Sequence, residues 1–192
     1  MKEKIEKNRL GVLESPQVGP ARPADVKNFI RMIPDFPKKG IQFRDITPLL
    51  SDGKIFRKCI RYFKKMSGRR IDCVISIESR GFILGSALAC ELGVGFVPIR
   101  KQGKLPSKTY QTSYQLEYGQ AVMEIHADGL KRGSRVLIVD DVLATGGTAK
   151  AAVDLARKFD AKIEGIYFLI ELEALRGRQK LEGYPVNSLV RY

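Results

Sequence analysis

The stretch that most limits how this chain can fold is VLIVDDVLATGGTAK, residues 136–150. Its first four residues are aliphatic, and a continuous apolar run is typical of a strand that is buried on both faces of a sheet. Asp140 and Asp141 follow directly, and a loop of small residues then opens a helix. This order predicts one strand–loop–helix unit of an α/β fold, with two carboxylates at the carboxyl edge of the sheet.

The same alternation of apolar runs and helical patterns continues from residue 52 onward. We predict strands at 71–77, 93–101, 120–127, 135–141 and 163–172. We predict helices at 51–66, 80–92 and 147–159, and a short one at 24–33 with Val26, Phe29, Ile30 and Ile33 on one face. Because the strands are mostly continuous apolar runs, the sheet should be largely parallel, with helices on both faces.

Length and composition indicate a single globular domain. We expect an N-terminal extension at 1–22, either partly disordered or packed on the surface, and one domain at 23–192. The chain has no run of about 18 apolar residues, and residues 1–10 are charged. We therefore expect a cytoplasmic protein with no membrane partner.

Charge and cysteine content narrow the kind of site. The net charge of +13 attracts polyanions, either nucleic acid or a substrate rich in phosphate. The basic residues are scattered rather than clustered in a nucleic-acid-binding module, which argues against the first. The cysteines are isolated from one another and from the only histidine, His126, so a zinc site is not expected.

The loop at 144–148 has the properties of a phosphate site. Gly146 and Gly147 allow the backbone to approach a ligand closely, and the start of the next helix offers free amides and a partial positive charge. Asp140 and Asp141 would repel phosphate but can accept hydrogen bonds from sugar hydroxyls. Together these groups suit a sugar phosphate. The alternative, an ordinary helix start beside two solvated aspartates, does not explain the combination.

The segment resembles the phosphoribosyl pyrophosphate signature of type I phosphoribosyltransferases. In that family the two acidic residues hold the ribose hydroxyls and the loop holds the 5′-phosphate. The resemblance therefore implies that Asp140 and Asp141 bind ribose. It assigns the 5′-phosphate to Ala144, Thr145, Gly146, Gly147 and Thr148.

Four further stretches resemble the adenine phosphoribosyltransferases within that family: PDFPKKGIQFRDITPLL, IESRGFILG, VPIRKQGKLP and YQLEYG. The resemblance implies the type I fold, with a small N-terminal hood at 23–50 and a flexible lid loop at 100–119. It implies transfer of the phosphoribosyl group from phosphoribosyl pyrophosphate to adenine, giving AMP and pyrophosphate. It further implies Mg²⁺ held mainly by substrate and water, a homodimer, and no nucleic-acid partner.

The resemblance also assigns the remaining site residues. The pyrophosphate would meet Glu78, Ser79, Arg80 and Gly81, together with Arg100, Lys101 and Lys104 from the lid. Arg80 would also act in catalysis, and Glu117 would handle the proton near the purine nitrogens. The base would contact Phe43, Arg44, Tyr118 and Leu172.

Three other functions stay open on the sequence alone. The first is a phosphoribosyltransferase for another base, such as xanthine or hypoxanthine. The second is a regulator that binds phosphoribosyl pyrophosphate and DNA, but residues 1–33 are too few for an added winged helix. The third, a basic nucleic-acid-binding protein, leaves the two aspartates and the loop unexplained.

Overall fold

The computed structural model describes residues 23–68, 70–115 and 120–192. Its centre is a sheet of seven strands in the order β5-β6-β4-β3-β7-β8-β9. The strands are β3 (Cys73–Ile77), β4 (Gly95–Lys101), β5 (Thr109–Gln115), β6 (Gln120–His126), β7 (Arg135–Leu143), β8 (Lys162–Glu171) and β9 (Val186–Arg191). Five neighbouring strands are parallel, in the order β4, β3, β7, β8 and β9. Strands β6 and β5 add an antiparallel edge beside β4. The prediction of a largely parallel sheet is therefore confirmed.

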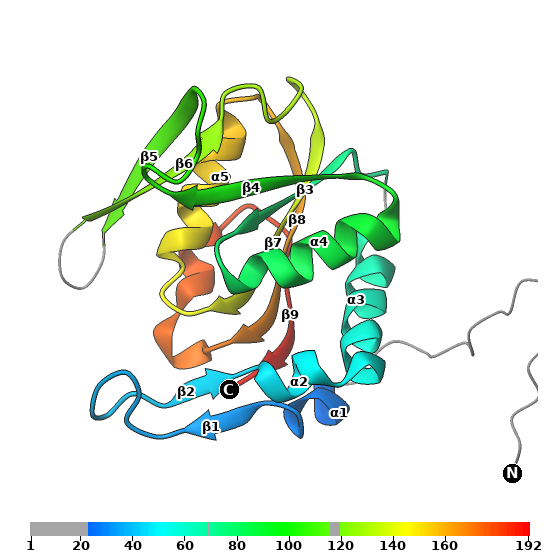
Figure 1. The fold of residues 1–192 in the computed structure, drawn as a ribbon, viewed down its shortest axis with the longest axis vertical. Coiled ribbons are helices and arrows are strands. Elements are labelled where there is room, and N and C mark those ends of the chain that lie inside the picture. Colours follow the sequence, from blue (N-terminus) through cyan, green and yellow to red (C-terminus); the bar gives the residue numbers. More distant parts are fainter. Residues whose placement is uncertain (1–22, 69, 116–119) are drawn as a thin grey trace, which may run out of the picture.

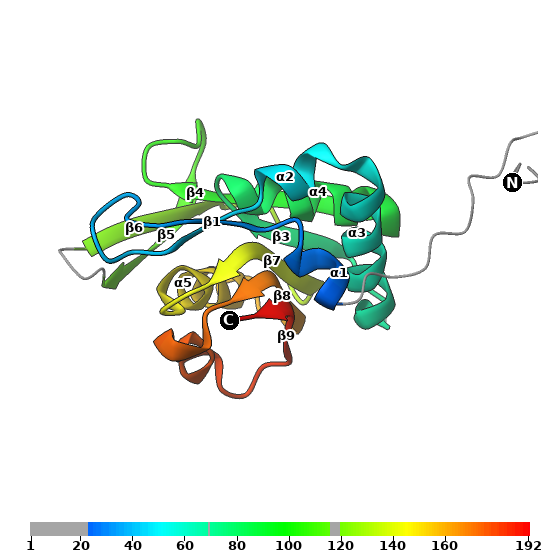
Figure 2. The same cartoon turned by 90° about the horizontal axis from the view of Figure 1, so that it is seen from below.

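Helices cover both faces of this sheet (Figures 1 and 2). On one face lie α3 (Gly53–Ser67) and α4 (Arg80–Leu92), and their apolar residues share a core with β7, β8 and β9. On the other face α5 (Gly147–Arg157) builds a second core with β3, β4, β6, β7 and β8. Because each central strand is buried on both faces, its sequence is apolar without alternation, as the pattern at 136–139 predicted.

The N-terminal hood at 23–50 differs from the prediction in detail. Its helix α1 (Pro23–Lys27) is shorter than expected, and Ile33 lies in a strand, β1 (Arg31–Ile33). The physical reason is twofold. Pro34 disfavours helix at the residue before it, and β1 gains pairing with β2 (Phe43–Asp45). A short helix, α2 (Thr47–Ser51), follows β2, so the proline-rich stretch is less irregular than predicted.

Four further elements were absent from the prediction. Part of the expected lid forms strand β5, which pairs with β6 over its whole length. Of the described lid residues, only 102–108 lie outside a strand. At the opposite edge β9 pairs with β8, preceded by two 3-10 helices, η1 (Glu173–Leu175) and η2 (Gly177–Leu181). These segments mix polar and apolar residues, so neither the helical nor the strand period of apolar residues is visible in their sequences.

The hood lies next to the carboxyl ends of the parallel strands, at the same end of the molecule as the C-terminus (Figure 1). Asp45 fixes its geometry. This carboxylate accepts hydrogen bonds from the Thr47 amide at 2.9 Å and hydroxyl at 2.6 Å, and Arg31 donates to it at 2.6 and 3.1 Å. These bonds, those from Thr47 first, lower the pKa of Asp45 to about 2.

We expect Asp45→Ala to lower the free energy of unfolding by about 2 kcal/mol at pH 7, since it removes hydrogen bonds to a charged group. The folded pKa lies below the unfolded value, so this stabilisation is complete above the unfolded pKa of about 4 and is lost as pH falls toward 2. Urea unfolding at pH 7 and at pH 3.5 to 4 tests this, with Asp128→Ala, whose side chain is 89% exposed, as control. A destabilisation that did not shrink with acid would contradict the assignment.

Candidate active site

The two adjacent aspartates lie near the end of β7, at the carboxyl edge of the sheet. The strand runs two residues further than predicted, to Leu143, and both aspartates are only 7% exposed. The Asp141 amide donates to Asp140 Oδ1 at 2.9 Å. Burial, reinforced by the charge of Asp141, raises the pKa of Asp140, and burial also raises the pKa of Asp141. Two buried carboxylates in contact form a strained acceptor pair that a ligand with hydroxyl donors would satisfy.

Arg80 forms an ion pair with the second of these carboxylates. It is the first residue of α4, and its Nη2 lies 2.7 Å from Asp141 Oδ2. That oxygen is buried and receives no well-directed hydrogen bond from the described residues, so the contact is an ion pair. The Arg80 guanidinium also lies 5.0 Å from the centre of the Phe43 ring. Arg80 therefore connects the aspartates with the segment expected to bind the base.

Gly81 lets the start of α4 approach the aspartates. A Cβ atom at this position would lie 2.6 Å from Asp140 Oδ1 and 3.2 Å from Ser76 Oγ. The hydroxyl of Ser76 in turn donates to the Val139 carbonyl at 2.5 Å. Gly81 is thus required by packing, and the predicted pyrophosphate segment is in direct contact with the predicted ribose carboxylates.

The loop at 144–148 leads directly from β7 into α5. Gly146 has φ of +77° and is the N-cap residue, with no side-chain hydrogen bond to the helix. The first amides of a helix have no intrahelical acceptor, so they are available to an anion. Thr145 is exposed and Thr148 half-buried. The five predicted residues of this loop run from the end of β7 into the first two residues of α5, shortly after Asp140 and Asp141 in the chain.

Glu78 has a different surrounding from that of an anion-binding residue. It accepts hydrogen bonds from the Lys101 amide at 2.9 Å and from Arg100 Nε at 2.8 Å. Burial alone would raise the pKa of Glu78, but these bonds outweigh it and the pKa is lowered. The Glu78 carboxylate therefore holds Arg100 and the end of β4 in position, and a cis peptide bond joins it to Ser79.

A carboxylate that was not among the predicted site residues holds Lys104, which was predicted to bind pyrophosphate. Glu124 in β6 is 2% exposed and accepts from the amides of Lys104 and Leu105, each at 3.0 Å. The side chains of Thr109 and Gln111 donate to it at 3.2 and 3.3 Å. An acidic residue inside the apolar stretch QAVMEIH was the available signal. Glu124 fixes the 102–108 connection next to Glu78 and Arg100.

The expected base-binding residues come from both ends of the domain. Phe43 packs edge-on against Phe36, with 5.1 Å between ring centres. Arg44 lies 4.0 Å from the ring centre of Tyr192, so its charge faces the C-terminal residue. The Leu172 amide donates to the Leu143 carbonyl at 2.9 Å, which holds Leu172 beside the end of β7. Glu117 and Tyr118 lie outside the described residues.

Among residues 23–68, 70–115 and 120–192, no group of three or more His, Cys, Asp or Glu is placed to hold a metal ion. No helix in these same segments is long and apolar enough to cross a membrane.

Comparison with known proteins identifies similar sequences and folds. The family described as "Phosphoribosyl transferase domain" matches residues 46–189. An adenine phosphoribosyltransferase of Thermotoga neapolitana is 54% identical over 169 residues, which cover 88% of this chain and 99% of the relative. One of Carboxydothermus hydrogenoformans is 55% identical over 169 residues, again covering 88% and 99%.

Solved structures agree with the sequence comparison. The adenine phosphoribosyltransferase of Thermoanaerobacter pseudethanolicus superposes with a TM-score of 0.85 at 50% identity, over 88% of this chain and 99% of the other. The enzyme of Saccharomyces cerevisiae, solved with adenine and D-2,5-dideoxy-2,5-imino-altritol 1,6-bisphosphate, gives a TM-score of 0.83 at 41% identity, over 86% and 97%.

Proposed function

The chain belongs to the adenine phosphoribosyltransferases of the phosphoribosyl transferase family, and from this premise we propose how its residues divide the reaction among them. The enzyme transfers the 5-phosphoribosyl group from phosphoribosyl pyrophosphate to adenine and releases AMP and pyrophosphate. The observation that carries the assignment of roles is the contact chain from Asp141 to Arg80 to Phe43, with 2.7 and 5.0 Å separations.

Asp140 and Asp141 bind the ribose hydroxyls. Both carboxylates are buried, and burial raises the pKa of each, so their charges would be stabilised by hydrogen bonds beyond those they already accept. Hydroxyl donors would supply them. The 5′-phosphate is bound by the amides and hydroxyls at 144–148, where the start of α5 adds a partial positive charge.

Basic residues stabilise the leaving pyrophosphate. A base nitrogen attacks C1′ while the bond to pyrophosphate breaks, and the ribose gains cationic character as negative charge grows on the leaving group. Arg80 lies beside the ribose carboxylates. Arg100 and Lys101 lie at the end of β4, which Glu78 holds, and Lys104 lies on the 102–108 connection, which Glu124 holds. Preorganised cations of this kind stabilise the departing charge without reorganising during the reaction.

A magnesium ion fits the chemistry of these donors. Mg²⁺ that accompanies a phosphorylated substrate is held mainly by substrate oxygens and water, with one or two carboxylates. Asp140 and Asp141 offer oxygen atoms of that kind at the carboxyl edge. When bound, the ion would neutralise charge on the pyrophosphate. Asp140, Asp141 and the loop at 144–148 would orient the substrate for the attack on C1′.

The base would lie against Phe43 and Leu172, and Arg44 follows Phe43 in the same strand. The resemblance to the family further assigns Glu117 to the proton of the purine and Tyr118 to closure over the site, and these roles remain proposals. A homodimer, a cytoplasmic location and the absence of a nucleic-acid partner are proposed on the same basis. Relatives solved with adenine, AMP and pyrophosphate support the choice of ligands.

We expect AMP formation from labelled adenine, phosphoribosyl pyrophosphate and Mg²⁺ to exceed turnover of hypoxanthine, guanine or xanthine by on the order of 100-fold or more. A base pocket that hydrogen-bonds the amino group of adenine leaves polar groups unpaired with an oxo-purine. Glu117→Ala should lower kcat on the order of 100-fold if its carboxylate transfers a proton.

Two results would redirect the proposal. Comparable turnover with another base would move the error to the Phe43 and Leu172 pocket and leave the ribose site unchanged. A Glu117→Ala variant with unchanged kcat at saturating substrates would remove the acid–base role from that residue.

A further inference from the structure

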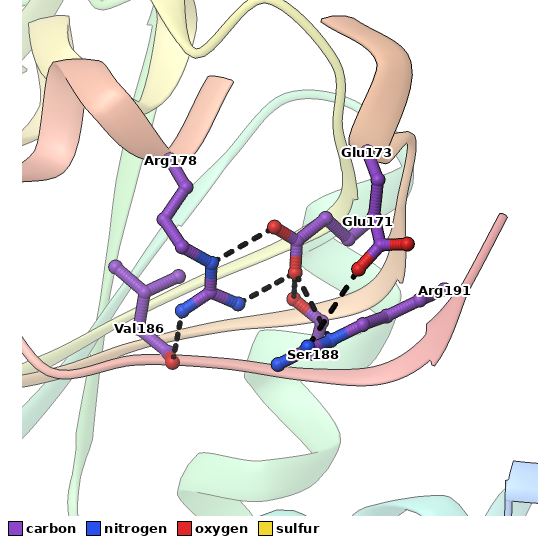
Figure 3. A network of polar contacts seen from close by, with 6 residues as sticks. All are labelled: Glu171, Glu173, Arg178, Val186, Ser188 and Arg191. Atoms are coloured by element: carbon purple, nitrogen blue, oxygen red, sulfur yellow. Dashed lines mark hydrogen bonds and ion pairs between the residues drawn. The ribbon is translucent and has the colours of Figure 1, made fainter. Parts of the chain in front are cut away.

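A buried carboxylate at the end of β8 anchors η2, which contacts residues 144–148, the loop proposed to bind the 5′-phosphate and called the phosphate loop below. Glu171 is 5% exposed and is the last residue of β8. Arg178 donates to it twice, from Nε to Oε1 at 2.9 Å and from Nη2 to Oε2 at 2.6 Å (Figure 3). Two parallel bonds of this kind hold a guanidinium in one orientation. Ser188 adds a third bond to the same carboxylate at 2.6 Å.

Arg178 is also tied to the edge strand. Its Nη1 donates to the Val186 carbonyl at 2.8 Å, so one side chain connects β8, β9 and η2. Hydrogen bonding from Arg178 lowers the pKa of Glu171, and that carboxylate in turn raises the pKa of Arg178. Both groups are therefore charged near neutral pH. Arg191 approaches the same carboxylate from β9, with its Nε 3.5 Å from Oε2.

The helix that contains Arg178 lies directly against the phosphate loop. It begins at Gly177, where an added Cβ would come within 2.2 Å of the Ala144 carbonyl oxygen and 2.8 Å of the Gly146 amide nitrogen. Conversely, a Cβ on Gly146 would lie 2.4 Å from the Gly177 carbonyl oxygen. The two backbones thus touch with no side chain between them. Leu181, 1% exposed, fixes the other end of η2 in the core.

The phosphate loop has little support of its own. Gly146 contributes no side chain, and α5 begins without a side-chain cap. Thr145 is exposed. The conformation that presents the first amides of α5 to a phosphate therefore depends on a neighbouring segment, and the backbone at Gly177 is in direct contact with it. What fixes Gly177 also fixes the loop.

We propose that Arg178 and Glu171 are positioning residues for the 5′-phosphate loop. Both act on the loop through Gly177 and not by contact with the 5′-phosphate. Their bidentate ion pair sets the position of Gly177, and the Gly177 backbone packs directly against Ala144 and Gly146. The inference deepens the proposed function, because it rests on the assignment of residues 144–148 to the 5′-phosphate.

The test compares Arg178→Met with Arg191→Met, using ribose 5-phosphate as the probe. Both variants remove a cation from Glu171, but Arg178 alone of this pair belongs to η2. We expect Arg178→Met to raise the calorimetric Kd for ribose 5-phosphate by on the order of 10- to 100-fold, as misplacement of binding groups does. The KM for phosphoribosyl pyrophosphate should rise with it, while the KM for adenine changes less than about twofold.

Arg191→Met should bind ribose 5-phosphate as the unchanged protein does, whatever its effect on Tm. Arg178→Lys keeps the charge without the bidentate geometry, so its Kd should lie between those of the unchanged protein and Arg178→Met. This conservative variant also keeps the test informative if Arg178→Met does not fold.

Thr148→Ala separates the inference from the role of the loop itself. If Thr148→Ala weakens binding while Arg178→Met and Arg178→Lys do not, the positioning role is wrong and the phosphate loop stands. If Thr148→Ala leaves the Kd unchanged as well, the assignment of the loop fails and the inference fails with it. Equal weakening in Arg178→Met and Arg191→Met would reduce the effect to general destabilisation and would also overturn the proposal.

Discussion

Asp140→Asn is expected to stabilise the ligand-free enzyme by about 1 kcal/mol and to lower kcat/KM on the order of 100-fold. The two effects have one origin. Burial and the neighbouring charge of Asp141 raise the pKa of Asp140, so its ionised form is disfavoured in the folded protein. Asparagine keeps an acceptor for the Asp141 amide but removes the charge that would receive the ribose hydroxyls.

The pH dependence of stability follows from the same shift. A carboxyl group whose folded pKa is raised contributes stability that is fully present below its unfolded pKa, near 4, and is lost as pH rises through the folded value. In the ligand-free enzyme this contribution should therefore decrease from about pH 4 upward. Asp140→Asn has no such group, so its advantage in Tm should grow over the same window.

Thermal unfolding between pH 5 and 8, together with steady-state kinetics, measures both effects. Asp128→Asn is the control, because that side chain is 89% exposed and far less constrained. We expect the control to change neither Tm nor kcat/KM appreciably. A less stable Asp140→Asn with full activity would contradict both the strained state of the aspartate pair and its role in binding ribose.

Gly146→Ala is expected to lower the free energy of unfolding by about 3 kcal/mol and to remove most binding of phosphoribosyl pyrophosphate. One part of the cost is the backbone conformation, since φ is +77° and an L side chain there costs about 1–2 kcal/mol. The rest is steric, because the new Cβ would lie 2.4 Å from the Gly177 carbonyl oxygen, a backbone atom that cannot rotate away. The loop would have to shift away from η2.

Gly133→Ala is a matched control for the backbone term. Gly133 has a similar φ of +74°, and a Cβ there meets nothing within 4 Å. We expect this variant to lose only about 1 kcal/mol and to keep its affinity for phosphoribosyl pyrophosphate. Urea unfolding and calorimetric titration of both variants separate the two terms. Equal losses of stability and unchanged binding in both would show that the contact with Gly177 is unimportant.

The central part of the fold could be predicted because its signals are local. The apolar run at 136–139, the carboxylates after it and the glycines at 146–147 determine a strand, a site and a helix start without reference to distant residues. The start of α4 at Arg80 and of α5 at Gly147 were predicted at the observed residues. The resemblance to the family identified the reaction from the same stretches.

The errors concern segments whose structure depends on partners far away in the sequence. Residues 31–33 became a strand because β2 lies beside them, and β9 pairs with β8 across an irregular connection. No period in these short, mixed sequences indicates such pairing. The tertiary contacts supply hydrogen bonds and burial that outweigh the local preference.

By itself the sequence determined the chemistry available at the carboxyl edge: two carboxylates, a small-residue loop and an arginine at a helix start. Only the tertiary structure decided how these groups meet. It paired Arg80 with Asp141, used Glu78 to hold Arg100 and Glu124 to hold the 102–108 connection, and placed Gly177 against the loop at 144–148. The physical reason is that residue type and local spacing fix what a group can bind, whereas contacts between segments many residues apart fix where it stands.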